Sequence, residues 1–225
     1  MQSELIDVGF FQWLANLLKD PRASIAKWII TFGPIWVYCP LFAIIFLETG
    51  LVVTPILPGD SLLFTAGVFA ADGGGLNIWV LIISMSIAAI LGNTSNYWIG
   101  RLVGSRIIAS GKVKSLTPER IEKTQAMLDK YGMIAIVLTR FFPIIRTFAP
   151  FLAGIGSMSF PRFTFFNIIG GVAWVCVFSL LGYFFGGIPF VQNNFELVII
   201  GIVVISLIPA AVGAIRMRLG NKKSE

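Results

Sequence analysis

Four ionisable side chains interrupt otherwise apolar stretches of the sequence: Glu48, Asp60, Arg140 and Arg146. A charged residue at the centre of a membrane helix costs roughly 2.5–3.5 kcal/mol, so such residues usually face a polar cavity or one another. Two carboxylates and two guanidinium groups sum to zero formal charge (−2 + 2). We therefore expect them to share one site, which is either a self-neutralising structural lock or the lining of a cavity for a charged substrate.

Arginine suits one class of substrate in particular. Its planar guanidinium binds phosphate or carboxylate through two parallel hydrogen bonds, and helix N-termini nearby would add further donors. Glu48 and Asp60 could carry protons and so couple transport to a proton gradient. The four charges alone leave anion transport, cation transport and a structural lock open. We favour a cavity because the backbone around the charges is also predicted to be irregular.

The composition indicates the environment in which these charges lie. Of the 225 residues, 56% are hydrophobic and 12% are charged, and the mean hydropathy is +0.87. A soluble domain carries roughly 25% charged residues, so the chain belongs to the membrane class. No linker divides it, which predicts one membrane domain over residues 28–215. Residues 1–27 read as an amphipathic segment at the membrane interface rather than a signal peptide, and residues 216–225 as a basic cytoplasmic tail.

Long apolar stretches predict an all-α integral membrane protein. Four of them can cross roughly 30 Å of hydrocarbon as full transmembrane helices: about 28–47, 76–100, 160–186 and 195–215. Two others contain prolines that should break a helix, and we predict them to be re-entrant hairpins of two short helices: about 48–71, with Pro55, Pro58 and Gly59, and 133–156, with Pro143.

The distribution of basic residues predicts the orientation. Seven of the 17 Lys and Arg residues lie between Arg101 and Lys130, whereas residues 72–77 and 187–194 contain none. The positive-inside rule places the first of these loops, with an amphipathic helix within 101–131, in the cytoplasm. Both termini are then cytoplasmic and the hairpins enter from opposite faces. Both hairpins end in similar sequence, Phe64-Thr-Ala-Gly67 and Phe151-Leu-Ala-Gly154, which indicates an inverted repeat.

Several kinds of site are disfavoured. The chain has no histidine, which removes His-based metal sites and Ser-His catalysis. Cys39 and Cys176 lie in apolar stretches and are read as packing residues. We therefore expect no metal, no cofactor and no enzymatic activity, and membrane topology explains the basic loops better than nucleic-acid binding. The GxxxG patterns at Gly100 and Gly182 predict close helix packing.

Two long segments resemble the signatures of the DedA family of bacterial inner-membrane proteins. The first runs from Glu48 to Phe64 (ETGLVVTPILPGDSLLF) and the second from Arg140 to Gly154 (RFFPIIRTFAPFLAG). The segments 92–97 (GNTSNY) and 167–174 (NIIGGVAW) also resemble family positions, and the resemblance covers about residues 35–215. It implies that Glu48 and Asp60 are essential acids and that Arg140 and Arg146 are essential arginines.

The resemblance also implies supporting positions at Pro55, Pro58, Gly59, Asn93, Tyr97, Pro143, Asn167 and Trp174. The sequence departs from the family at one of them, because relatives often have Asp where this chain has Asn93. A proton-carrying role is therefore not expected at that position.

The family is related to eukaryotic proteins of the VTT class, some of which scramble phospholipids. Bacterial members are implicated in returning undecaprenyl phosphate, the lipid carrier of cell-wall synthesis, to the cytoplasmic leaflet, and in maintaining the proton motive force. The resemblance thus implies a flippase in the bacterial inner membrane. Its partners would be a polyprenyl phosphate lipid and the phospholipid bilayer, with protons and a second copy of the chain as further candidates. Alternatives are a proton-coupled transporter of small cations or drugs, a membrane phosphatase and a structural membrane protein.

Overall fold

The computed structural model describes residues 21–51, 59–71, 75–110, 134–141, 145–156, 158–194, 197–198 and 201. Over these residues it contains helices and no strand, which confirms the predicted all-α class. The helices are α2 (Pro21–Phe32), α3 (Pro34–Gly50), α4 (Gly59–Ala71), α5 (Ile78–Ser110), α7 (Ile134–Thr139), α8 (Ile145–Ile155), α9 (Phe160–Phe185) and α10 (Pro189–Asn193).

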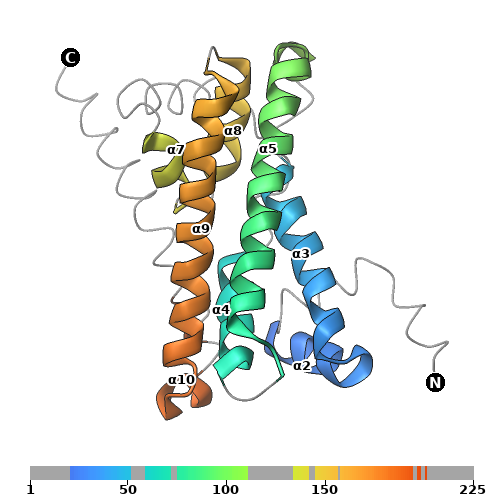
Figure 1. The fold of residues 1–225 in the computed structure, drawn as a ribbon, viewed down its shortest axis with the longest axis vertical. Coiled ribbons are helices and arrows are strands. Elements are labelled where there is room, and N and C mark those ends of the chain that lie inside the picture. Colours follow the sequence, from blue (N-terminus) through green and yellow to red (C-terminus); the bar gives the residue numbers. More distant parts are fainter. Residues whose placement is uncertain are drawn as a thin grey trace.

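Two long helices, α5 and α9, run side by side along the molecule (Figure 1). Their apolar parts, Ile78–Gly104 and Phe160–Phe185, contain 27 and 26 residues. At 1.5 Å per residue each is about 40 Å long, which exceeds the thickness of the hydrocarbon core. Both helices expose large apolar side chains, such as Trp79 and Phe165, to the surroundings. They correspond to two of the four predicted spans.

Two short apolar helices lie against opposite ends of this pair. In Figure 1, α4 lies along the lower half of α9 and α8 along the upper half of α5. With 13 and 11 residues, α4 and α8 are about 20 Å and 17 Å long, too short to cross the hydrocarbon core. The first turn of α4 contains Asp60 and the first turn of α8 contains Arg146. Both charged residues are buried inside the molecule.

Glycine allows α4 and α9 to approach each other closely. A Cβ atom on Gly67 would overlap the Ser179 carbonyl group, with its carbon at 3.0 Å. A Cβ atom on Gly182 would overlap the Phe64 carbonyl group, with its carbon at 2.8 Å. Backbone atoms cannot move aside as a flexible side chain can, so these contacts need glycine.

The contact between α5 and α8 repeats this geometry. A Cβ atom on Gly154 would overlap the Tyr97 carbonyl group, with its carbon at 3.0 Å. One on Gly100 would overlap the Phe151 carbonyl group, with its carbon at 2.9 Å. The two similar segments singled out in the sequence thus make equivalent contacts, and the close packing predicted from the GxxxG patterns is confirmed.

The predicted first span, about 28–47, is not one continuous helix in the structure. The helix breaks at Gly33, whose φ of +83° suits glycine, and Pro34 then starts α3 without a backbone N–H. The start of α3 lies beside the start of α5, because the Asn77 amide donates to the Tyr38 hydroxyl at 2.7 Å. The chain from residue 34 to residue 77 therefore leaves one end of the molecule and returns to it.

This departure changes the predicted orientation. Residues 21–33 lie at the same end of the molecule as residues 75–77 (Figure 1). The sequence predicts that the segment before the first span lies on the cytoplasmic side and that residues 72–77 lie on the outer side. These two predictions therefore cannot both be correct. The predicted domain boundary at residue 27 falls within α2. The predicted cytoplasmic helix near 119–131, the basic tail and nearly all of the span 195–215 lie outside the described residues.

Candidate functional site

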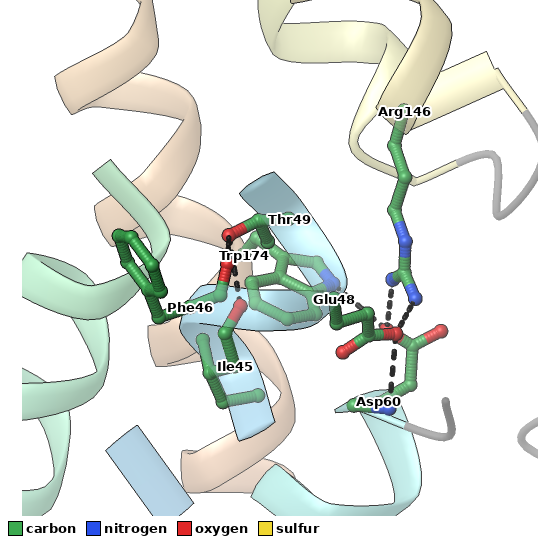
Figure 2. Close-up of polar contacts among 8 residues, drawn as sticks. Ile45, Phe46, Glu48, Thr49, Asp60, Arg146 and Trp174 are labelled. Atoms are coloured by element: carbon green, nitrogen blue, oxygen red, sulfur yellow. Dashed lines mark hydrogen bonds and ion pairs between the residues drawn. The ribbon is translucent and has the colours of Figure 1, made fainter. Parts of the chain in front are cut away.

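Three of the four predicted ionisable residues meet where α3 ends and where α4 and α8 begin (Figure 2). Arg146 donates from Nη1 to Asp60 Oδ1 at 2.7 Å and from Nη2 to Glu48 Oε1. All three residues are buried, with exposed fractions of 0% for Glu48, 8% for Asp60 and 6% for Arg146. The structure thus brings Asp60 next to an arginine, as the sequence predicted.

The start of α4 is built around the same carboxylates. Asp60 lies in the first turn of α4, where the helix dipole favours a negative charge. The Gly59 amide donates to Glu48 Oε1 at 3.2 Å, so Glu48 satisfies one of the amides that a helix N-terminus leaves unpaired. A Cβ atom on Gly59 would lie 2.7 Å from Glu48 Cδ. A larger residue at position 59 would therefore push the Glu48 carboxylate away from the start of α4.

Trp174 of α9 completes this cluster. Its indole Nε1 donates to Asp60 Oδ1 at 2.9 Å, and its ring lies 5.3 Å from Arg146 Cζ in a cation–π contact. Trp174 is buried. One side chain therefore orients both members of the Arg146–Asp60 pair.

Arg140 lies apart from the carboxylates, which corrects the expectation of one shared ionic site. Its Nη2 donates to Asn167 Oδ1 at 2.5 Å and to the Ala89 carbonyl oxygen at 3.4 Å. The Asn93 amide satisfies both its ends when its oxygen lies 2.9 Å from Arg140 Nη2 and its nitrogen 3.2 Å from the Thr49 carbonyl oxygen. Within the described part of the chain, no carboxylate forms an ion pair with Arg140.

Two adjacent glycines of α9 make room for Arg140. A Cβ atom on Gly170 would lie 3.1 Å from Arg140 Cδ, and one on Gly171 would lie 3.3 Å from Arg140 Nη2. The sequence reasoning did not assign these glycines a role. A pair of glycines inside a long apolar helix was the signal that could have found them.

Asn96 is a further residue that the sequence reasoning missed. Its Nδ2 donates to the Thr147 carbonyl oxygen at 2.7 Å and to the Thr49 carbonyl oxygen at 3.4 Å. Those carbonyls belong to the residues that follow Arg146 and Glu48. Asn96 follows Asn93 by three residues, so both asparagines lie on one face of α5 and connect it to the charged ends of α3 and α8.

Comparison with known proteins places this site in a family. A model of the VTT domain matches residues 57–184, and the chain is 47% identical to the protein DedA of Escherichia coli (strain K12) over 94% of this chain and 95% of that protein. The chain belongs to the DedA family. It is also 42% identical to an uncharacterized membrane protein of Mycobacterium tuberculosis (strain H37Rv), covering 79% of this chain and 78% of that protein. No solved structure matches the chain.

A further relative supports the location of the chain in the inner membrane. The inner membrane protein YghB of Escherichia coli (strain K12) is 37% identical over 70% of this chain and 72% of its own length. Together with the apolar helices α5 and α9, these relatives place the chain in the bacterial inner membrane as an integral membrane protein.

Of the other predicted supporting residues of this DedA-family chain, the structure describes Tyr97. Tyr97 is outside the charged cluster: its hydroxyl donates to the Met158 carbonyl oxygen at 2.8 Å, and its ring stacks on Phe163 with centroids 4.5 Å apart. It connects α5 to the start of α9. The three prolines Pro55, Pro58 and Pro143 lie outside the described residues.

The described residues provide no cluster of three or more His, Cys, Asp or Glu side chains that could hold a metal ion. The site offers instead two buried carboxylates, two buried guanidinium groups and an indole N–H. Such a set can bind an anion, exchange ion pairs or take up protons.

Proposed function

We propose that this protein is a flippase that returns undecaprenyl phosphate across the bacterial cytoplasmic membrane. The observation that supports it is the pair of buried guanidinium groups, Arg140 and Arg146, in a membrane protein of the DedA family. Buried arginines recognise phosphate well because their planar donors match its oxygens. The family resemblance implies a polyprenyl phosphate as substrate.

The proposal includes two re-entrant hairpins that enter from opposite faces. In this proposal the first hairpin begins before the predicted residues 48–71 and consists of α3 and α4, and the start of α3 lies beside the start of α5. The other contains α7 and α8 at the opposite end of the α5–α9 pair (Figure 1). The inner ends of the short helices then meet near the middle of the bilayer, where inverted repeats commonly form transport sites.

In the proposed cycle the prenyl tail stays in lipid while the phosphate passes between the inner ends of the hairpins. A phosphate monoester carries about −1.5 to −2 charges at neutral pH. Glu48 and Asp60 both form ion pairs with Arg146. Protons that neutralise these carboxylates would free Arg146 for the phosphate, which would couple the cycle to the proton motive force.

The same ion pairs disfavour the cation-transport alternative. A cation that binds Glu48 or Asp60 has to replace Arg146, which already donates to both carboxylates. A phosphate instead supplies negative charge to the arginines. Arg146 needs such a partner once Glu48 and Asp60 are protonated.

Leaflet exchange in liposomes tests the function. Purified wild type, Arg146→Gln and the control Arg162→Gln are reconstituted with undecaprenyl phosphate or with ordinary phospholipid, with and without a pH gradient. Arg162 is exposed near the start of α9. We expect wild type and Arg162→Gln to move undecaprenyl phosphate faster than phospholipid, and Arg146→Gln to move neither lipid.

Three outcomes would contradict the proposal. If Arg146→Gln exchanges undecaprenyl phosphate between leaflets as fast as wild type does, Arg146 has no role in translocation. Equal rates for phospholipid remove the lipid specificity. Release of inorganic phosphate from undecaprenyl pyrophosphate by the purified chain would indicate a phosphatase instead.

A further inference from the structure

We propose that this protein consists of two rigid units that move against each other during lipid exchange, and that Asp60 joins them through its ion pair with Arg146. The first unit consists of α3, α5 and α8, and the second of α4, α7 and α9. The inference rests on the proposed flippase function. It goes further because it gives different tasks to Glu48 and Asp60, the two carboxylates that contact the same arginine.

The packing of the short helices defines the two units. Each long helix holds two short ones: α3 and α8 pack against α5, whereas α4 and α7 pack against α9 (Figure 1). The contacts of α3 with α4, and of α7 with α8, are less extensive. The two arms of each proposed hairpin therefore belong to different units.

Close backbone contacts at glycines hold each unit together. In addition to the glycine contacts that join α8 to α5 and α4 to α9, a Cβ atom on Gly92 of α5 would lie 2.8 Å from the Phe46 carbonyl oxygen of α3. In the second unit, a Cβ atom on Gly170 of α9 would lie 3.1 Å from the Cα atom of Val137 in α7. Backbones packed this closely leave no space for one helix to shift against the other, so each unit should move as one body.

The contacts between the units are made by side chains. Asn167 of α9 donates from Nδ2 to the Ile90 carbonyl oxygen of α5 at 3.0 Å, and Arg140 Nη2 donates to the Ala89 carbonyl oxygen at 3.4 Å. Among the described residues, a Cβ atom added to a glycine of these six helices would meet the other unit at side-chain atoms, those of Glu48 and Ile90. Side chains change rotamer more easily than a helix backbone moves, so this interface can open and form again.

The four buried ionisable residues are divided equally between the units. The first unit contains Glu48 and Arg146. The second contains Asp60 in α4 and Arg140, which follows α7 and donates to Asn167 of α9 at 2.5 Å. Each unit therefore carries one acid and one arginine, with a formal sum of zero (−1 + 1). Separation of the units leaves neither of them with a net charge from these residues.

Asp60 is the carboxylate that joins the units (Figure 2). Its ion pair with Arg146, at 2.7 Å, connects α4 to α8, whereas the ion pair between Glu48 and Arg146 lies within the first unit. When the units separate, Arg146 keeps Glu48 as its partner. Asp60 keeps the indole N–H of Trp174, which lies 2.9 Å away in the second unit. Because no buried charge loses every partner, this ion pair is the one that can break to open a path for the phosphate.

Distances between spin labels on the purified full chain test the units without requiring transport. Labelled cysteines replace Trp79 and Ile155, both in the first unit, or Trp79 and Phe184, which lie in different units, in a chain whose two native cysteines are serine. All three labelled positions are exposed. Asp60→Asn should shift or broaden the 79–184 distance distribution by about 2 Å or more, the scale of helix displacements in switching proteins. The 79–155 distribution should not change.

Glu48→Gln is the matched control. It removes the other carboxylate from the same arginine, leaves the ion pair of Asp60 in place and keeps an oxygen for the Gly59 amide. We expect both of its distance distributions to equal those of wild type. If Asp60→Asn leaves the 79–184 distance unchanged, or if Glu48→Gln shifts it as far, Asp60 does not join the units. A 79–155 distance that changes with the 79–184 distance would show that the first unit is not rigid.

Disulfide cross-linking tests whether lipid exchange needs the movement. Cysteines replacing Ile90 and Gly171 would join the units, because a Cβ atom on Gly171 would lie 3.0 Å from Ile90 Cγ1. Cysteines replacing Gly104 and Ile155 would join α5 to α8 within the first unit, because a Cβ atom on Gly104 would lie 2.7 Å from Ile155 Cδ1. Each oxidised chain is compared with its own reduced form, so that effects of the substitutions cancel.

Oxidation should slow the exchange of undecaprenyl phosphate by about tenfold or more for the pair between the units, and by less than about twofold for the pair within one unit. Reduction should restore the rate. Equal rates for the oxidised and reduced forms of the pair between the units would contradict the movement.

The spin-label distances keep the two proposals distinguishable. If Asp60→Asn shifts the 79–184 distance but wild type exchanges no lipid, the flippase function is contradicted and the two units remain. If wild type exchanges undecaprenyl phosphate but Asp60→Asn shifts no distance, only the assignment of the units and of Asp60 is contradicted.

Discussion

Arg146 lies between Glu48 and Asp60, with one guanidinium nitrogen on each carboxylate, although 98 and 86 positions separate them along the chain. The arrangement joins the end of α3 and the starts of α4 and α8 in one buried cluster. For an anion to pair with Arg146 in place of these carboxylates, the elements must separate or protons must neutralise Glu48 and Asp60. The stability of the cluster and the function of the site are therefore connected.

The first prediction concerns the loss of the shared cation. Arg146→Gln leaves two buried carboxylates without a counter-charge, so we expect a loss of about 3–5 kcal/mol in the free energy of unfolding. Adding Glu48→Gln and Asp60→Asn to the same chain should recover part of the loss. Chemical denaturation in detergent measures both variants. A triple variant as unstable as Arg146→Gln would show that the charges are not the cause.

The second prediction concerns the indole N–H of Trp174. Trp174→Phe keeps an aromatic ring beside Arg146 but removes the donor to Asp60, and a hydrogen bond to a charged group contributes about 1.5–3 kcal/mol. Trp174→Leu also removes the ring. We expect thermal stability in detergent and lipid exchange to decrease in the order wild type, Trp174→Phe, Trp174→Leu. If Trp174→Phe matched wild type in both measurements, the hydrogen bond would have no role.

The third prediction concerns the connection that Asn96 makes between α3, α5 and α8. Asn96→Leu leaves the Thr147 carbonyl oxygen without this donor, so we expect a loss of about 1–3 kcal/mol in the free energy of unfolding. Ser95→Ala is the control, because among the described residues the Ser95 hydroxyl donates to the Leu91 carbonyl oxygen of its own helix and to no other helix. The contrast is measured by denaturation, and equal losses for both variants would contradict the connecting role.

The fourth prediction tests the glycine contacts of the short helices. Gly67→Ala and Gly154→Ala put a methyl group against a neighbouring helix backbone, at α4–α9 and α5–α8 respectively. Overpacking of this kind costs about 1–3 kcal/mol. Gly201→Ala is the control because no atom of the described residues lies within 4 Å of its added Cβ. Unfolding midpoints should fall for the first two variants and not for the control; a Gly67→Ala chain as stable as Gly201→Ala would show that the contact is looser than described.

The fifth prediction tests whether residues 27 and 71 lie on one side of the membrane and residue 159 on the other. Single cysteines at Lys27, Ala71 and Ser159, all exposed, are made in a chain whose Cys39 and Cys176 are serine. A membrane-impermeant thiol reagent on intact cells should label the cysteines at 27 and 71 alike and leave the one at 159 unlabelled until the membrane is opened. Labelling of 71 without 27 would restore the full first span predicted from hydropathy.

The sequence by itself determined the class of the protein and singled out four charged residues, all of which are buried in the structure. Long apolar stretches require helices in a bilayer, because every backbone polar group needs a partner within its own segment. The cost of charge in lipid singles out Glu48, Asp60, Arg140 and Arg146 without any coordinates. The similarity of residues 64–67 to residues 151–154 is also visible in the sequence, and the structure gives both segments close helix contacts, at Gly67 and Gly154, that leave no room for a Cβ atom.

Tertiary structure decided how these residues are divided. Hydropathy does not show that the helix breaks at Gly33 and Pro34, because apolar residues continue on both sides of the break. The formal charges alone do not show that Arg146 pairs with both Glu48 and Asp60, whereas Arg140 donates to the side-chain amides of Asn93 and Asn167. Pairing depends on which side chains from distant helices come within hydrogen-bonding distance, and only the packing of α3, α4 and α8 against α5 and α9 sets those distances.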